Sequence, residues 1–230
     1  LAQIISDIME ICRKELMCDV EIEFAADIFN DTGLVLKLLQ VRPVGEFSED
    51  KNTTIEKASE SISNVILRSG KALGSGYSDT MKYIIHVPSA SFDSAKTKEM
   101  AKEISMLNEM LKKEGAYYLL TGPGRWGSSD PWLGIPVLWS EISEARMIVE
   151  TAIPGYQIEP SQGTHFFQNI TSLGVGYLTI DTVRGDGAVD EETISALECV
   201  QKGEYTRLYR APEGLEGYID RSSNKAIVGY

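Results

Sequence analysis

Apolar and polar residues follow two different periods at the start of the chain. In residues 1–16 the apolar positions recur every three or four residues with Glu, Arg and Lys between them, which predicts an amphipathic helix. From residue 19, DVEIEFAADI alternates apolar and acidic residues, NDTG supplies a turn, and LVLKLLQVRP runs to Pro43. A period of two predicts strands, so we expect a β-hairpin here.

A polar and acidic stretch, GEFSEDKNTT, follows the hairpin at residues 45–54. Its composition is typical of a surface linker. We therefore expect a domain boundary at this stretch, with one unit at residues 1–47 and a second at residues 55–230.

The second unit mixes strand-like and helical patterns. Residues 94–115 repeat apolar positions at three and four, with Ser94 to cap the start and Gly115 to close the end, which predicts a helix. After residue 190 we expect one helix and a few short strands. Strand-like runs separated by glycines occur at residues 65–76, 81–88, 116–122, 135–139, 164–170 and 175–181. Strands interleaved with helices predict a mixed α/β (α+β) fold.

Composition narrows the classes of partner. The formal net charge is -12 and the pI is near 4.7, so nucleic acid is not expected as a partner, and an anionic ligand needs a local basic pocket. Three scattered cysteines do not make a disulfide framework, which favours the reducing cytoplasm. No apolar run is long enough for a membrane span. The chain begins with Leu1 rather than Met, so we expect a longer parent protein.

Residues 121–136 read TGPGRWGSSDPWLGIP and are rich in glycine and proline. The spacing from Gly122 to Gly127 nearly fits a phosphate-binding loop, but Ser128 stands where that pattern has a lysine. Arg125 can supply a planar guanidinium instead, so we predict an anion-binding loop that uses Gly124, Arg125, Gly127 and Ser128. A loop that merely joins two buried elements is the alternative. The tryptophans in and beside the stretch suit a rigid, partly dry pocket wall.

The hairpin carries three side chains that suit a nucleotide. Glu23 is on the first strand, and Gln40 and Arg42 are two positions apart on the second, which places these two on one face. A carboxylate can bind a ribose hydroxyl, an amide can read a base or a phosphate, and a guanidinium can clamp phosphate. A solvated face with a salt bridge is the alternative.

The first 44 residues resemble a known family. The helix, VEIEFAAD, the turn and LKLLQVRPV are similar to the closing segment of the ATP-grasp nucleotide-binding domain of the phosphoenolpyruvate synthase and pyruvate phosphate dikinase family, where D-I-E-[WF] precedes L-Q-x-R-P. The resemblance implies that Glu23, Gln40 and Arg42 contact ATP, with the arginine close to the transferred phosphates. It also implies that Mg and the upstream part of the parent chain complete the site.

The next domain of that family swivels and carries a phosphate on a histidine, within a G-x-T-S-H segment that precedes a G-I-P strand. GRWGSSDPWLGIPVLW resembles this segment in the order of its glycine, its hydroxyls and GIPV, but Asp130 stands where the histidine would be. The resemblance implies a divergent swivelling phosphohistidine domain in which the phosphate carrier has been lost or replaced.

Two histidines could replace it. His86, inside YIIHVP, is expected to be a core or edge residue of a strand. His165 follows a glycine among Ser161, Gln162 and Thr164, so it is the candidate catalytic residue, and packing on the two phenylalanines after it is the alternative. Neither histidine has a Cys or His neighbour at metal-ligand spacing, so no metal site is predicted.

These patterns together predict a function. The chain is expected to be part of an ATP-dependent phosphotransferase like those of the family, with a nucleotide and a small anionic substrate as its ligands and no nucleic acid or membrane as a partner. By itself this part is expected to be inactive. The alternative is a noncatalytic binding or docking module on a family-like scaffold.

Overall fold

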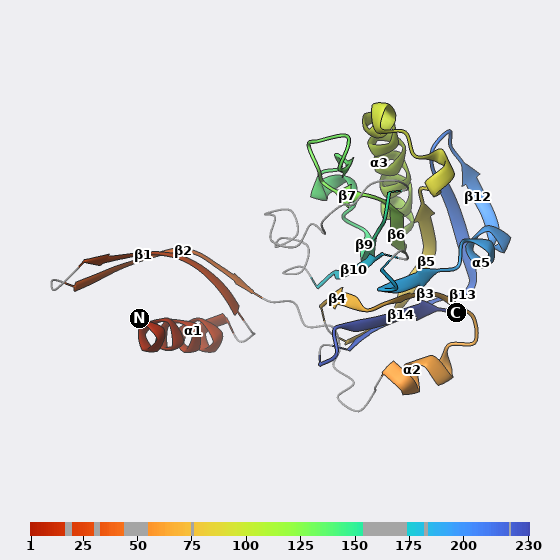
Figure 1. Ribbon diagram of the computed structural model, residues 1–230. Helices are drawn as coiled ribbons and strands as arrows, with labels where there is room; N and C mark the ends of the chain where they lie inside the picture. The colour runs from red at the N-terminus through yellow and green to blue at the C-terminus, as the bar shows by residue number, and fades with distance from the viewer. Residues whose placement is uncertain are drawn as a thin grey trace.

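The computed structural model describes residues 1–16, 20–29, 33–43, 55–74, 76–153, 174–181, 184–220 and 222–230 (Figure 1). Strands dominate these residues, and helices flank them, so the fold is mixed α/β. The α-helices are α1 (Ala2–Leu16), α2 (Ile55–Ser61), α3 (Thr97–Glu114) and α5 (Glu191–Ala196). The strands are β1 (Val20–Phe29), β2 (Gly33–Pro43), β3 (Val65–Ser69), β4 (Lys71–Leu73), β5 (Gly76–His86), β6 (Tyr117–Pro123), β7 (Arg125–Trp126), β8 (Gly134–Ile135), β9 (Ala145–Thr151), β10 (Gly176–Ile180), β11 (Gly187–Val189), β12 (Glu198–Lys202), β13 (Arg207–Asp220) and β14 (Lys225–Gly229).

The first three elements confirm the helix and the hairpin predicted from periodicity. β1 and β2 pair as an antiparallel two-stranded sheet, and α1 contacts β1. The register shifts by one residue between Glu23 and Phe24, where Leu39 is the extra residue of a β-bulge. Figure 1 shows α1, β1 and β2 at one side of the molecule, away from the larger sheet.

Ten strands form the larger sheet, in the order β11-β3-β14-β13-β5-β6-β9-β10-β4, with β12 paired to β13. Its centre, β5-β6-β9-β10, is parallel, whereas the flanking strands pair antiparallel. β3 and β4 follow each other in sequence with only Gly70 between them, yet they stand near opposite ends of the strand order. The sheet must therefore curl until its two ends meet, and it is nearly closed.

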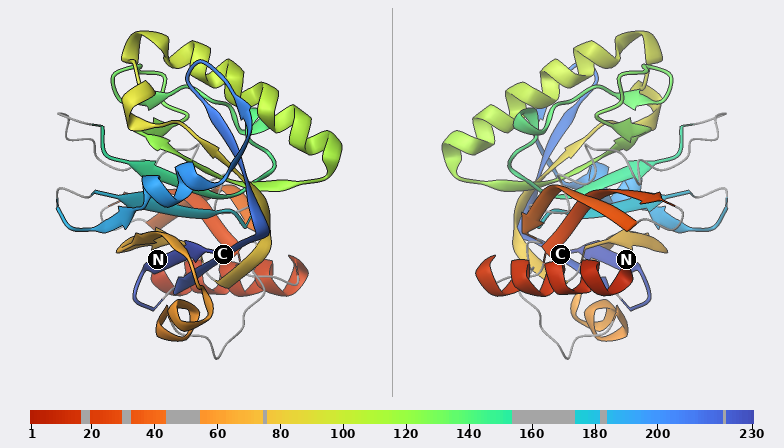
Figure 2. Two further views of the ribbon diagram at one scale, coloured as in Figure 1. Left: turned by 90° about the vertical axis from the view of Figure 1, so that its right-hand side faces the viewer. Right: turned by 90° about the vertical axis from the view of Figure 1, so that its left-hand side faces the viewer.

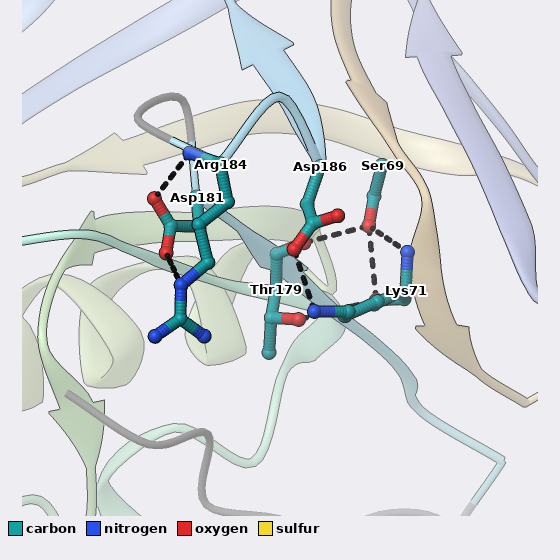
Figure 3. Close-up of polar contacts among 6 residues, drawn as sticks. All are labelled: Ser69, Lys71, Thr179, Asp181, Arg184 and Asp186. Atoms are coloured by element: carbon teal, nitrogen blue, oxygen red, sulfur yellow. Dashed lines mark hydrogen bonds and ion pairs between the residues drawn. The ribbon is translucent and has the colours of Figure 1, made fainter. Parts of the chain in front are cut away.

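Side-chain contacts hold these two ends together, as Figure 3 shows. The Ser69 hydroxyl donates to the main-chain oxygens of Thr179 (2.7 Å) and Lys71 (2.9 Å), and it accepts the Lys71 N–H (3.0 Å). The Lys71 ammonium forms an ion pair with Asp186 at 2.5 Å. Ser69 is buried, so its hydroxyl joins β3, β4 and β10 where water does not compete.

Apolar side chains fill both faces of the larger sheet. One core lies inside the curled sheet, and alternate residues of the same strands form a second core under α3. A smaller cluster packs α2 against β13 and β14. In Figure 2, α3 in yellow-green and α2 in orange lie on opposite sides of the sheet. Within the part of the chain that the structure describes, no helix combines the length and the apolarity needed to cross a bilayer.

Four sequence-based predictions about elements and caps differ from the structure. The strand expected at residues 135–139 is only the two-residue β8, and a 3-10 turn begins at Trp139. Residues 145–151, which had no strand predicted, form the central strand β9, because a strand buried on both faces lacks alternation. The expected short strands after residue 190 include the long strand β13 (Arg207–Asp220).

Ser94 lies in a 3-10 turn capped by Asp93 rather than at the cap of α3. Gly115 closes α3 with φ of 65°, as predicted.

Candidate functional site

The β1–β2 register brings the predicted nucleotide residues together along the backbone. Glu23 is directly paired with Gln40, and Arg42, paired with Glu21, follows two positions further on β2. Cross-strand partners share a face, as do positions two apart on a strand. The side chains of Glu23 and Gln40 are both exposed. The structure thus places the carboxylate and the amide as neighbours on an accessible face.

The opposite face of the hairpin is apolar. Phe24 and Leu38, which are paired in the register, are 36% and 45% exposed, while Val20 near the start of β1 is buried at 4%. The hairpin is therefore amphipathic, with its polar face bearing the nucleotide candidates.

The glycine-rich stretch folds into a compact turn rather than an open loop. β7 and β8 pair in parallel, with Arg125 opposite Gly134 and Trp126 opposite Ile135. A Cβ atom at Gly134 would lie 1.9 Å from the Arg125 carbonyl oxygen, so only glycine fits there. Gly124 adopts φ of 80°, which also favours glycine. Close backbone packing and a positive φ thus explain two of the four glycines in this stretch, Gly134 and Gly124.

Trp126 anchors this turn in the core below α3. Its side chain is 2% exposed, and its indole N–H donates to the Val149 carbonyl at 2.9 Å. A Cβ atom at Gly122 would lie 3.2 Å from the indole ring, so this glycine leaves room for it. By contrast, Trp132 is 58% exposed. The structure thus buries Trp126 and leaves Trp132 exposed, so only Trp126 is part of the dry core.

The main-chain N–H groups of the turn already donate within the protein. Those of Gly124, Arg125 and Gly127 donate to the carbonyls of Thr151, Leu133 and Ile135 at 2.9, 2.7 and 2.9 Å. A phosphate-binding loop presents such groups to its ligand. An anion at this turn would consequently rely on side chains, the Arg125 guanidinium above all.

Ser128 and Asp130 have local roles in the same turn. The Ser128 hydroxyl donates to the Asp130 carbonyl at 3.0 Å and accepts the Asp130 N–H at 3.2 Å. The Asp130 carboxylate accepts the Trp132 N–H at 3.0 Å. Asp130 thus stabilises the turn through a hydrogen bond typical of Asx-turns.

A buried carboxylate that sequence reasoning missed lies against the turn. Glu150, in β9, is 6% exposed; its Oε1 accepts the Trp126 N–H at 3.1 Å and its Oε2 accepts the Tyr177 hydroxyl at 2.5 Å. An available signal was the lone charge that follows the apolar run MIV in ARMIVET. Charged groups are rarely buried unless they are paired or hydrogen-bonded. Glu150 therefore positions the backbone next to Arg125.

Of the two histidines, only His86 lies among the residues that the structure describes. His86 is buried at 3%, as expected of a strand residue. Burial, the largest cause, lowers its pKa to about 4; a hydrogen bond to the Thr121 backbone opposes this shift, and the positive charge of Arg207 contributes to it. His86 is therefore neutral at pH 7. His165 lies outside the described residues, so its catalytic role stays a prediction.

In the described ranges, no group of three or more His, Cys, Asp or Glu side chains is arranged to hold a metal ion. The acidic pair nearest the sheet closure, Asp181 and Asp186, is engaged with cations instead. Asp181 contacts Arg184 at 3.5 Å, and Asp186 contacts Lys71 (Figure 3).

No model of a known protein family matches the chain significantly, and no curated protein or solved structure does so either.

Proposed function

We propose that the chain contributes part of the nucleotide site of an ATP-dependent phosphotransferase, similar in kind to the phosphoenolpyruvate synthase and pyruvate phosphate dikinase family. The observation that carries the proposal is the β1–β2 register, which pairs Glu23 with Gln40 and puts Arg42 two positions further along β2. An acid, an amide and a guanidinium at neighbouring positions suit the ribose, the base or phosphate, and the outer phosphates of ATP.

The net negative charge of the chain sets a requirement for a nucleotide site of this kind. With a net charge of -12 the molecule repels ATP at long range, so binding needs a concentrated set of donors and a neutralising Mg ion. In the proposed phosphotransferase, a Mg ion bound with ATP would balance the charge of the phosphates. The remaining part of the site comes from the upstream portion of the parent protein.

The glycine-rich turn is the second element of the proposal. Arg125 binds an anionic group of the substrate, with Gly124, Gly127 and Ser128 shaping the turn around it. The Glu150 contact to Trp126 supports this role, because it fixes the residue next to Arg125. A backbone held in this way loses less conformational entropy when the neighbouring Arg125 binds a ligand.

The test is an ATP titration of the natural protein that contains this chain, by calorimetry with Mg present. We expect Arg42→Ala to weaken ATP binding by about 10-fold to 100-fold, because a charge-assisted hydrogen bond is lost. Gln40→Ala and Glu23→Ala should each weaken it by up to about tenfold. Asp27→Ala is the matched control, since Asp27 is an exposed acid on the same strand, four residues from Glu23. Unchanged affinity in Arg42→Ala would remove the nucleotide assignment.

One observation favours a noncatalytic docking module as the second candidate function. The N–H groups of the turn are used internally, while the apolar side chains of Trp132 and Leu138 nearby are 58% and 65% exposed. Exposed apolar groups of this size suit a protein contact. Incubation of the natural protein with ATP separates the two candidates: an acid-labile phosphoryl group on His165 rules out the docking module.

A further inference from the structure

The strand register places three polar residues in one row inside the larger sheet. His86 of β5 is paired with Thr121 of β6 on one side and with Arg207 of β13 on the other. Paired residues share a face of the sheet. Ile84 and Leu119, paired two residues earlier, belong to the interior core, so the row also faces the interior.

This row lies at the carboxyl end of the parallel strands, where β5 ends at His86. The carboxyl ends of parallel strands are the usual binding edge of α/β sheets. Elsewhere the same row is apolar, because Thr121 is paired with Val149 and Val149 with Leu178. Polar side chains in such a layer cost free energy unless they are hydrogen-bonded.

Two of the three polar side chains are buried with an unsatisfied atom. Thr121 is 0% exposed and His86 is 3% exposed. Thr121 Oγ1 and His86 Nδ1 have no hydrogen-bond partner among the residues that the structure describes. A hydroxyl and a neutral imidazole from adjacent strands can both donate to one ligand. Their shared row makes a single common ligand the simplest partner.

Arg207 adds a positive charge beside this pair. Its Nη1 donates to the carbonyls of Gly203 (2.8 Å) and Thr206 (2.7 Å), which hold the guanidinium in place. A guanidinium has five N–H groups, so these two bonds leave three for other acceptors. Arg207 is half-buried, unlike its two neighbours, so it marks the side from which a ligand enters.

We propose that this end of the sheet binds a small oxyanion, a carboxylate or phosphate group, between Arg207, His86 and Thr121. Arg207 supplies the charge and a planar fork of donors, and the imidazole and the hydroxyl donate to the oxyanion from the interior. This site uses none of the hairpin or turn residues, so it stands independently of the proposed nucleotide site.

The imidazole of His86 is a direct probe, because the chain has only two histidines. The 230-residue chain is titrated at pH 7 with inorganic phosphate and, separately, with acetate, and the histidine resonances are followed by NMR. His86→Gln assigns the His86 signal. We expect a saturable shift of that signal, with affinity about tenfold lower in Thr121→Val and in Arg207→Gln. Thr121→Ser, which keeps the hydroxyl, should bind as the unmodified chain does.

Three results would overturn the oxyanion site. The first is a His86 signal that neither anion shifts saturably. The same result is expected if His86 and Thr121 bind only an internal water molecule. The second is equal affinity for the anion in the unmodified chain and in Arg207→Gln. Arg207 is partly exposed, so this substitution is the least disturbing to the fold. The third is a shift confined to His165. The stronger of the two anions identifies the oxyanion as carboxylate or phosphate.

Discussion

His86 and Glu150 are buried on opposite faces of the same sheet, where they have different hydrogen-bond partners. Glu150 accepts hydrogen bonds from the Trp126 N–H and the Tyr177 hydroxyl, which stabilise a carboxylate. Burial lowers the pKa of His86 to about 4, and its Nδ1 has no hydrogen-bond partner among the residues that the structure describes. Neighbouring strands thus supply hydrogen bonds to Glu150, whereas burial dominates the pKa of His86.

The buried His86 makes stability depend on pH. Its pKa falls from 6.5 to about 4 on folding. Between these pH values the unfolded chain therefore binds more protons than the folded chain does. Acidification lowers the free energy of unfolding by about 3 kcal/mol for this reason. The contribution is complete above pH 6.5 and is lost as the pH falls through 4. Urea unfolding at several pH values should show this slope in the unmodified chain and a shallower one in His86→Gln. Identical slopes would mean that His86 titrates normally in the folded protein.

At the scale of elements, the glycine-rich turn depends on the approach of β7 to β8. Gly134→Ala would put a methyl group 1.9 Å from the Arg125 carbonyl oxygen. We expect it to lower the free energy of unfolding by about 3 kcal/mol or more, because the backbone must move apart. Chemical denaturation measures the change.

Gly115→Ala is the matched control for this prediction. Gly115 has φ of 65° and no atom within 4 Å of an added Cβ atom. Its substitution should cost about 1 kcal/mol from backbone strain alone. Equal costs at Gly134 and Gly115 would contradict steric crowding in the turn.

Elements with a clean period were predictable from the sequence, and buried ones were not. The helix α1 and the hairpin follow from amphipathic spacing, since each has one solvated face. β9 is covered on both faces, so its residues carry no alternating signal. For the candidate site, the same alternation placed Gln40 and Arg42 on one face, but the pairing of Glu23 with Gln40 depends on a bulge at Leu39 that no local pattern indicated.

At the scale of the whole molecule, closure of the larger sheet depends on Ser69. Ser69→Ala removes hydrogen bonds to Thr179 and Lys71 at the junction of β3, β4 and β10. We expect a loss of about 1 to 3 kcal/mol in the free energy of unfolding, because buried polar groups are left unpaired. The measurement is urea unfolding followed by circular dichroism.

Lys71→Met provides the comparison, because it removes only the ion pair with Asp186. The side chains of Lys71 and Asp186 are 48% and 28% exposed. Exposed ion pairs contribute about 0 to 1 kcal/mol. A larger loss from Lys71→Met than from Ser69→Ala would show that the ion pair, and not the buried hydroxyl, holds the junction.

The sequence by itself determined the amphipathic helix, the hairpin and the end of α3 at Gly115. These features depend on residues close together in the chain, whose spacing fixes which face is apolar. Only the tertiary structure decided that the sheet closes through Ser69, that Glu150 lies against the turn, and that Arg207, His86 and Thr121 share one interior row. Each of these depends on strands far apart in sequence, and their register is set by the packing of the whole core.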